Sequence, residues 1–315
     1  MDRADLIGKL FPAVPTLFDS EGKLDGPANE SYADYMSSCP VDGVAVWVHT
    51  GRGPFLNEDE KKKLMSIWKE RFGDGLMIAG VGVDADVFHR EGEISYLEKT
   101  VRVAEMAKEN GADAILVFPP KPFEFSEEKI LEYHRKISEV GLPMILFYLY
   151  REAGGIEYGF ELLEKLLRID EVVGVKLATL YSVIKMQDIS NFVIEKFPSK
   201  VLITGEDRMF GYSLMRGSRS ALIGIGSVLP EIQKEMMRSF FNGKYGKFFD
   251  LMIKVDKLAE SLFVEPMEGY IERIEYALFL LGIVPKENVH DPYGPGITDS
   301  DRMKVRKVLT ELGYL

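Results

Sequence analysis

One lysine of this sequence lies inside an apolar, valine-rich run, Glu171-Val172-Val173-Gly174-Val175-Lys176-Leu177-Ala178. The run is too short for a full helix, and its composition predicts a strand that is buried on both faces. Because burial disfavours the charged ammonium, we expect the pKa of Lys176 to fall toward neutrality. A partly neutral amine is what Schiff-base formation with a ketone requires. The alternative is a lysine paired with a carboxylate at the end of its strand.

Two other features could serve the same chemistry. Tyr148 ends a neighbouring apolar run, and its phenol could carry protons to and from a carbinolamine; the alternative is a core tyrosine with a satisfied hydroxyl. The Thr50-Gly51 turn offers a hydroxyl and backbone N–H groups suited to a small carboxylate, or it is an ordinary strand-to-helix turn. His49, in the same turn, is an acid or base by residue type. His134 lies among charged residues of a helix, and we expect it on the surface.

Eight short, β-rich runs alternate with segments of helical periodicity, which predicts parallel βα units. The count of eight over about 230 residues indicates a (β/α)8 barrel of the TIM type. No Gly-x-Gly-x-x-Gly fingerprint follows the first run, which disfavours a doubly wound sheet. The expected strands are Val14–Phe18, Gly43–Val48, Leu76–Gly82, Ala114–Pro119, Met144–Tyr150, Val172–Ala178, Lys200–Glu206 and Ser220–Gly226.

Capping residues support the positions of the helices. Asn57 and Glu60 have the spacing of an N-cap and its N3 carboxylate, and Ser126 precedes two acids in the same way. The expected helices of the barrel are Asn57–Phe72, Leu97–Asn110, Ser126–Val140, Gly159–Arg168, Ser182–Phe197 and Arg208–Met215.

After Pro230 the pattern changes to helices without strands. We therefore expect a barrel over residues 1–230 and a C-terminal helical extension over 231–315. The expected helices of the extension are Glu231–Asn242, Phe248–Leu262, Gly269–Leu281 and Asp299–Leu312.

Charge and composition limit the classes of partner. The formal net charge of −11 over 315 residues argues against a nucleic-acid partner. Cys39 is the only cysteine, so no intrachain disulfide or cysteine metal site is expected. The sequence has no spacing typical of a metal site or phosphate loop, so we expect no cofactor. With no signal-like start and no apolar run that could span a bilayer, we expect a soluble cytoplasmic protein without a membrane partner.

In a barrel of this type the site lies at the carboxyl ends of the strands. At these ends, Arg52 follows the second predicted strand, Arg151 follows the fifth, and Ile223 lies in the eighth. Glycines at 224 and 226 follow Ile223, so a ligand could approach that backbone closely.

Over nearly its whole length, the sequence resembles the dihydrodipicolinate synthase / N-acetylneuraminate lyase family of class I Schiff-base aldolases. Val14–Phe18 matches the family's first strand, and His49-Thr50-Gly51-Arg52 its Gly-Thr-Thr-Gly-Glu turn. Tyr148 to Gly155 matches its Tyr-Asn-x-Pro-x-x-x-Gly segment, and Gly174-Val175-Lys176 its Gly-x-Lys. Leu262–Pro266 and Tyr293–Arg302 match its C-terminal helical part.

The resemblance implies roles for these residues. Lys176 would form the imine with a 2-oxo acid such as pyruvate, and Tyr148 would transfer protons. Thr50, with the backbone around Gly51, would hold the carboxylate of the 2-oxo acid. The resemblance also implies a homotetramer and an aldehyde or sugar-acid co-substrate.

Several positions depart from the family. The turn has Val48, His49 and Arg52 where the family has Gly, Thr and Glu, and Pro119-Pro120-Lys121 replaces a segment that carries a tyrosine in the synthases. Two of the three members of the synthases' proton relay are therefore missing. Ala153 stands in the place of their substrate-binding arginine, so we do not expect lysine biosynthesis through dihydrodipicolinate. The loop Gly82–Leu97 is about ten residues longer than the family pattern and should shape the pocket of the second substrate.

We therefore predict a lyase, an aldolase or hydro-lyase, that acts through a 2-oxo acid imine on Lys176. We expect His49 to take over part of the lost relay. Arg52 or Arg151 would bind a second carboxylate, or each would pair with Glu152, Glu206 or Asp207. The alternative function is a barrel that binds a 2-oxo acid or sugar acid without turnover, as a sensor.

Overall fold

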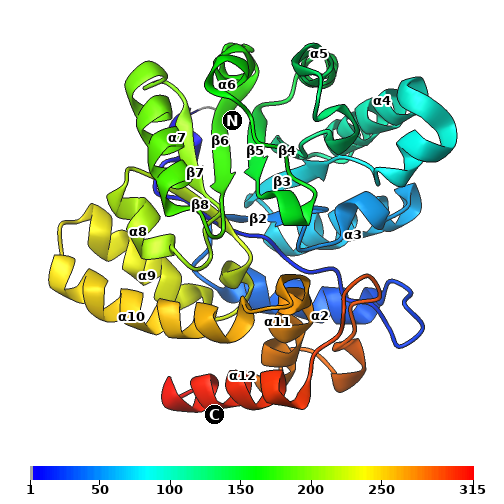
Figure 1. Ribbon diagram of the computed structural model, residues 1–315. Coiled ribbons are helices and arrows are strands. Elements are labelled where there is room, and N and C mark those ends of the chain that lie inside the picture. The colour runs from blue at the N-terminus through cyan, green and yellow to red at the C-terminus, as the bar shows by residue number, and fades with distance from the viewer. Residues whose placement is uncertain (1–2) are drawn as a thin grey trace.

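The computed structural model describes residues 3–315 (Figure 1). Within this part of the chain, eight parallel strands form one sheet in the order β1-β8-β7-β6-β5-β4-β3-β2. A parallel bridge between Ala13 and Ala45 joins the two ends of the sheet, so the strands close into the predicted (β/α)8 barrel. The strands are β1 Leu10–Pro12, β2 Gly43–Val46, β3 Leu76–Val81, β4 Ala114–Val117, β5 Met144–Leu149, β6 Val172–Ala178, β7 Val201–Thr204 and β8 Ser220–Ile223.

Helices surround the barrel, and their ends lie where the capping residues predict. The Asn57 side chain accepts from the Glu60 N–H while Glu60 caps the Asn57 N–H, and the Ser126 side chain accepts from the Lys129 N–H. The helices from the N-terminus to β8 are α1 Arg3–Leu6, α2 Gly26–Ser38, α3 Glu58–Phe72, α4 Asp86–Glu109, α5 Glu127–Ser138, α6 Phe160–Leu167, α7 Val183–Lys196 and α8 Phe210–Met215.

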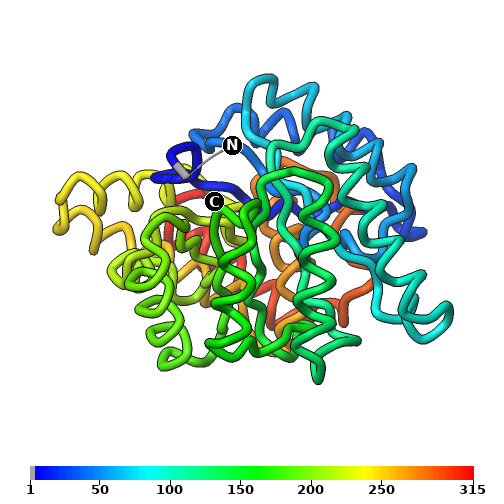
Figure 2. The backbone as a smooth tube through the Cα atoms, turned by 90° about the horizontal axis from the view of Figure 1, so that it is seen from above, coloured from blue at the N-terminus to red at the C-terminus, as the bar shows by residue number. Residues whose placement is uncertain are grey.

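The last two helices, α11 and α12, lie across one end of the barrel. Figure 1 places α11 below the strands, and the view in Figure 2 shows the orange and red segments behind the ring of barrel elements. The extension is therefore in a position to contribute side chains to that end. The helices after β8 are α9 Pro230–Phe241, which lies beside α8, α10 Tyr245–Leu262, α11 Tyr270–Leu280 and α12 Asp299–Glu311, with short 3-10 turns at Met267–Gly269 and Lys286–Asn288.

The core has two parts, as the alternation of side chains along each strand requires. One cluster fills the barrel interior and includes Phe11, Ile78, Leu116, Phe147 and Leu222. The larger cluster lies between the strands and the surrounding helices. Within residues 3–315, no helix is both long enough and apolar enough to cross a bilayer.

Three sequence-based expectations about the fold were wrong. The first strand is Leu10–Pro12, whereas Val14–Phe18 forms a loop with a single isolated bridge, from Phe18 to Leu24. The segment Gly82–Leu97 is mostly helix, because α4 begins at Asp86 and is kinked at Gly92, where φ is 88°.

The third wrong expectation was a surface position for His134, because this side chain is fully buried. Its Nδ1 lies 2.7 Å from the Ile130 carbonyl oxygen, and its ring packs edge-on against Tyr133 and Tyr158. The charged neighbours of His134 in the sequence face outward, while the histidine faces the barrel.

Candidate active site

Lys176 lies on β6 with its side chain in the barrel interior. In the sheet it is level with Phe147 of β5 and Ile203 of β7, and both of these belong to the interior cluster. The Lys176 Nζ lies 4.2 Å from the centroid of the Phe147 ring. Only 6% of the residue is exposed. The amine predicted from the sequence therefore faces the interior of the barrel.

The surroundings of Lys176 favour its neutral form. Burial lowers the pKa of Lys176 to about 8, and the charges of Asp207 and Glu206 oppose that shift. None of the ion pairs within 4.0 Å that residues 3–315 form includes this amine. At pH 7 about a tenth of Lys176 is thus uncharged and nucleophilic, far more than for an exposed lysine.

The two carboxylates at the end of β7 have different surroundings. Glu206 Oε1 accepts from the Thr179 N–H at 2.6 Å and from the Thr179 hydroxyl at 2.8 Å, so Glu206 holds the turn that follows β6. Asp207 Oδ1 accepts from the Ile225 N–H at 2.7 Å. Burial raises the pKa of Asp207 to about 6, against the backbone hydrogen bonds and the charge of Lys176. Asp207 is therefore an acid and base candidate that the sequence did not single out.

Tyr148 does not lie beside Lys176. It is level with Leu177 in the sheet, and both side chains belong to the cluster outside the barrel. Its ring packs edge-on against Tyr158 at 5.8 Å. The expectation that Tyr148 reaches the amine fails because neighbouring residues of a strand point to opposite faces.

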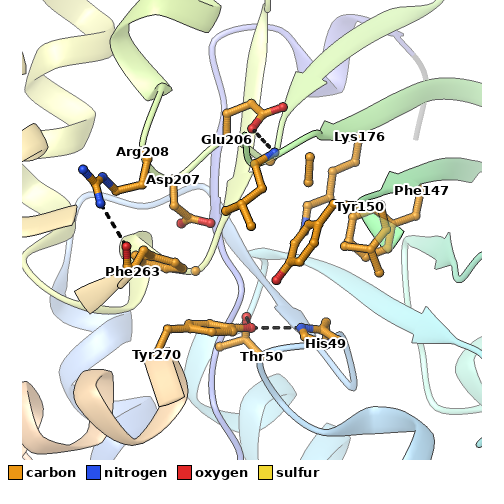
Figure 3. Close-up of a pocket in the computed structure, with 15 residues that line it drawn as sticks. His49, Thr50, Phe147, Tyr150, Lys176, Glu206, Asp207, Arg208, Phe263 and Tyr270 are labelled. Carbon is orange, nitrogen blue, oxygen red and sulfur yellow. Dashed lines mark hydrogen bonds between the residues drawn. The ribbon is translucent and has the colours of Figure 1, made fainter. Parts of the chain in front are cut away.

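Tyr150 brings a phenol to the lysine instead. The strand ends at Leu149, and the chain turns at Tyr150 so that its ring lines the pocket around Lys176. Figure 3 shows Tyr150, Lys176 and Asp207 turned toward the same space. We call this pocket the lysine chamber; its other polar lining residues include His49, Thr50 and Tyr270.

The turn after β2 forms the floor of the lysine chamber. Trp47 and Arg52 both adopt positive φ, and a Cβ on Gly53 would stand 1.6 Å from the Trp47 oxygen, so this tight turn requires glycine there. The Thr16 hydroxyl donates to the Gly51 carbonyl oxygen at 2.7 Å, and the Gly51 N–H donates to Val48. These contacts hold the turn so that the residues before Gly51 face the chamber.

A residue of the extension binds this turn. The Tyr270 hydroxyl, from the first residue of α11, lies 3.0 Å from Thr50 Oγ1 and 3.1 Å from His49 Nδ1 (Figure 3). The Tyr270 ring stacks on Phe263 at 4.8 Å between centroids. Burial lowers the pKa of His49, opposed by the charge of Glu268, so the imidazole is neutral near pH 7. The sequence places His49 and Thr50 at the site but does not indicate Tyr270.

Arg52 is occupied by carboxylates that differ from those expected. It forms a two-pronged pair with Asp291, with Nη2 at 2.6 Å and Nε at 3.1 Å, and Nη1 lies 3.0 Å from Glu268. Only 5% of Arg52 is exposed. The guanidinium therefore joins the turn to the extension.

Arg151 and Ile223 lie outside the lysine chamber. Arg151 is 53% exposed and makes only loose pairs with Glu124 and Glu157, at 3.6 and 3.8 Å. The Ile223 side chain belongs to the outer cluster, and its carbonyl oxygen accepts from the Ala13 N–H. Gly224, the next residue, lines the chamber.

A second pocket adjoins the lysine chamber and shares His49 and Leu149 with it. We call it the outer pocket; it is also lined by Arg52, Phe118, Lys121, Glu152, Ala153, Glu268 and Tyr293. Lys121 is paired with Glu124, as Arg52 is with Asp291. The outer pocket thus has aromatic and acidic walls, and its two cations are already neutralised. Among residues 3–315, no group of three or more His, Cys, Asp or Glu is arranged to hold a metal ion.

The barrel, its helical extension and a buried lysine on the sixth strand define the architecture of a known class of proteins, and sequence comparison identifies it. The model of the dihydrodipicolinate synthetase family matches residues 6–312. The chain belongs to this family.

Individual relatives are distant but match over the full length. A 4-hydroxy-tetrahydrodipicolinate synthase of Methanothrix thermoacetophila is 24% identical, with 97% of each chain covered. A prophage protein of the family from Escherichia coli K12, solved with pyruvate, superposes with a TM-score of 0.83 at 20% identity, covering 98% of this chain and 99% of the other. An N-acetylneuraminate lyase from Mycoplasma synoviae gives 0.78 at 19% identity, with 98% of both chains covered. The structural matches establish a shared fold.

Proposed function

We propose that this protein is a Schiff-base lyase that binds pyruvate or a related 2-oxo acid as an imine on Lys176. The observation that carries the proposal is the position of the amine: it is inside the barrel, over the Phe147 ring and without an ion-pair partner within 4.0 Å among residues 3–315. Membership of the family and the pyruvate complex of the Escherichia coli relative support this choice of substrate.

The proposed chemistry begins with the neutral amine of Lys176. It adds to the ketone carbon to give a carbinolamine, and loss of water gives an iminium ion. The iminium accepts the electron pair of a bond to the adjacent carbon, so a C–C bond can be broken or formed, or a C–O bond eliminated, before hydrolysis frees the amine. Tyr150 is the phenol placed to exchange protons with the carbinolamine oxygen. It takes the role that the sequence assigned to Tyr148.

Thr50 is the proposed partner of the substrate carboxylate. The Gly51 N–H already donates to the Val48 carbonyl oxygen at 3.0 Å, which leaves the start of the turn for an incoming anion. The Thr50 hydroxyl can donate to that anion while its oxygen accepts from the Tyr270 hydroxyl, 3.0 Å away. The ammonium form of Lys176 adds favourable charge during binding. We do not assign a role in binding the 2-oxo acid to Arg151 or Ile223.

The second substrate is proposed to be an aldehyde without a second carboxylate. Arg52, the expected partner of such a group, is neutralised by Asp291 and Glu268. Glu152 and Glu268 line the outer pocket and would repel another anion. Ala153 supplies no charge there. Uncharged hydroxyaldehydes suit aromatic walls with acceptor oxygens better than dicarboxylates do.

Turnover separates the lyase from a barrel that only binds a 2-oxo acid. The purified protein is incubated with 13C-labelled pyruvate and a panel of aldehydes, including glyceraldehyde, erythrose and succinic semialdehyde, and products are followed by NMR. The proposal expects an aldol product with an uncharged hydroxyaldehyde and little or none with succinic semialdehyde. Saturable pyruvate binding with no product from any aldehyde, and no release of pyruvate from hydroxylated 2-oxo acids, would favour the sensor.

A further inference from the structure

A chain of polar contacts leads from the lysine chamber to the opposite side of the turn after β2. Thr50 and Tyr270 both line the chamber, and their hydroxyl oxygens are 3.0 Å apart. The Tyr270 oxygen is also 3.1 Å from His49 Nδ1. On the far side of the imidazole, Nε2 lies 3.6 Å from Glu268 Oε2. The four groups follow one another without a gap larger than these distances.

The inner and outer ends of this chain differ in their access to solvent. Thr50 is buried and 4% exposed, and Tyr270 is 5% exposed. The Glu268 side chain is 34% exposed and lines the outer pocket. Glu268 Oε1 has no hydrogen-bond partner among the described residues, whereas Oε2 accepts from Arg52. A proton that reaches Glu268 therefore has an unpartnered, buried oxygen to occupy, on a side chain whose exposed part lies at the outer pocket.

We propose that Thr50, Tyr270, His49 and Glu268 form a proton relay between the lysine chamber and solvent. The inference rests on the proposed imine chemistry, since only that chemistry would release and consume protons in the chamber. It assigns a function to the C-terminal extension, because the 3-10 turn before α11 and its first residue supply two of the four groups.

The transfers balance at each step. A proton released in the chamber goes to Thr50 Oγ1, whose own proton passes to the Tyr270 oxygen. Tyr270 passes its proton to His49 Nδ1, and the proton on His49 Nε2 goes to Glu268. Each of the first three groups gains one proton and loses one, so charge changes only at Glu268, which exchanges with water. The reverse transfers deliver a proton to the substrate carbon.

The surroundings suit such a relay. Burial lowers the pKa of His49, which keeps one imidazole nitrogen free to accept. Burial also raises the pKa of Tyr270 well above its usual value, so the phenol gives up a proton only as it receives another. The charged groups around the relay are Lys176, Arg52 and Asp291, and Arg52 holds Glu268 in place.

The alternative is a purely structural network that fastens the extension to the barrel. The two readings differ in what Tyr270→Phe should change. This substitution keeps the ring stacked on Phe263 and removes the hydroxyl between Thr50 and His49. A structural role predicts a lower melting temperature with unchanged proton exchange. The relay predicts a selective loss of proton exchange.

The test is the exchange of the pyruvate methyl protons for deuterium in D2O, followed by NMR with the full-length protein. The extent of imine formation is measured in parallel by borohydride reduction and mass spectrometry. Tyr270→Phe and Glu268→Gln are compared with Tyr276→Phe, which makes the same change at a half-buried tyrosine of α11 outside the chamber. Melting temperature reports folding. Glu268→Gln, at a partly exposed position, keeps the test valid if Tyr270→Phe does not fold.

The relay predicts that both relay variants slow the exchange at least about tenfold. Imine trapping by Glu268→Gln should stay within about twofold of the wild type, because Glu268 does not line the lysine chamber. Tyr276→Phe should exchange at the wild-type rate. Unchanged exchange in a folded relay variant with normal trapping overturns the relay alone. Absence of trapping in the wild type overturns the proposed function, and the relay with it.

Discussion

The backbone of Gly205 lies directly against the side chain of Lys176. A Cβ built on Gly205 would stand 2.6 Å from Lys176 Cε and 3.0 Å from the Leu177 carbonyl oxygen. Glycine at the end of β7 thus leaves the space through which the lysine reaches the chamber.

Gly205→Ala is therefore expected to displace the amine. A shift of about 1 Å in a reacting group can cost on the order of 100-fold in rate, so imine formation with pyruvate should slow at least about tenfold. Overpacking should also destabilise the protein by about 1–3 kcal/mol. The rate of imine formation is obtained by adding borohydride at set times and measuring the amount of reduced imine. Gly246→Ala on α10 is the control, because a Cβ there meets no atom within 4 Å.

Tyr150→Phe should lower turnover by roughly 100-fold, because it removes the phenol that lines the lysine chamber. Tyr148→Phe is the matched control: it removes a hydroxyl outside the barrel and should leave turnover within about twofold. Steady-state rates of pyruvate release or aldol formation measure both. Equal loss in the two variants, or loss in Tyr148→Phe alone, would restore the sequence-based assignment.

The rate of imine formation should depend on pH through Lys176. Burial lowers the pKa of this amine to about 8. The neutral, nucleophilic form therefore increases as the pH rises from 6 to 9. The initial rate of reductive trapping should rise over this interval, with its midpoint near pH 8. A rate still increasing steeply above pH 10 would mean that the amine has the pKa of an exposed lysine.

Arg52 is expected to affect stability more than substrate choice. Arg52→Met would leave the buried Asp291 without its counter-ion, which costs about 3–5 kcal/mol. Arg151→Met, at an exposed site, should change stability by less than about 0.5 kcal/mol. Urea denaturation measures the difference. If Arg52→Lys left stability intact and raised only the KM of a dicarboxylate aldehyde, Arg52 would be a substrate ligand after all.

His134 should contribute to acid sensitivity. Burial lowers its pKa to about 4 from 6.5, and its Nε2 has no hydrogen-bond partner among the described residues. Below pH 6.5 the unfolded chain binds this proton and the folded protein does not, so stability falls until about pH 4, by roughly 3 kcal/mol in total. His134→Phe should reduce that fall in melting experiments, whereas His89→Asn, at an exposed site, should not. Identical pH slopes in all three proteins would contradict the assignment.

The sequence predicts the barrel well because its evidence is local and repeated. Seven of the eight apolar runs supply a strand, and the capping residues at Asn57 and Ser126 place the helix starts. The error at the first strand arose because Val14–Phe18 is as apolar as a strand, although it packs as a loop. Its neighbour Leu10–Pro12 pairs with β8 through the backbone, which composition alone does not reveal.

The candidate active site is only partly predictable from the sequence, because an apolar run does not show which of its side chains face the barrel interior. Lys176 stands out as the lone charge in an apolar run, but Met144–Leu149 has no polar alternation to show which side chains face inward. A register shift at Met144 and Ile145 adds to that ambiguity. Tyr148 and Tyr150 are therefore indistinguishable in sequence. Tyr270 lies more than 200 positions from Thr50, and only the packing of the extension brings them together.

The central claim is that the Lys176 amine forms an imine with a 2-oxo acid. The most direct measurement is the mass of the protein after reduction by borohydride in the presence of pyruvate, followed by peptide mapping, for the wild type and for Lys176→Met. The account predicts one added pyruvate-derived group per chain, located on the peptide that contains Lys176 and absent from the variant. An unmodified wild-type protein, or a label on another lysine that persists in Lys176→Met, would contradict it.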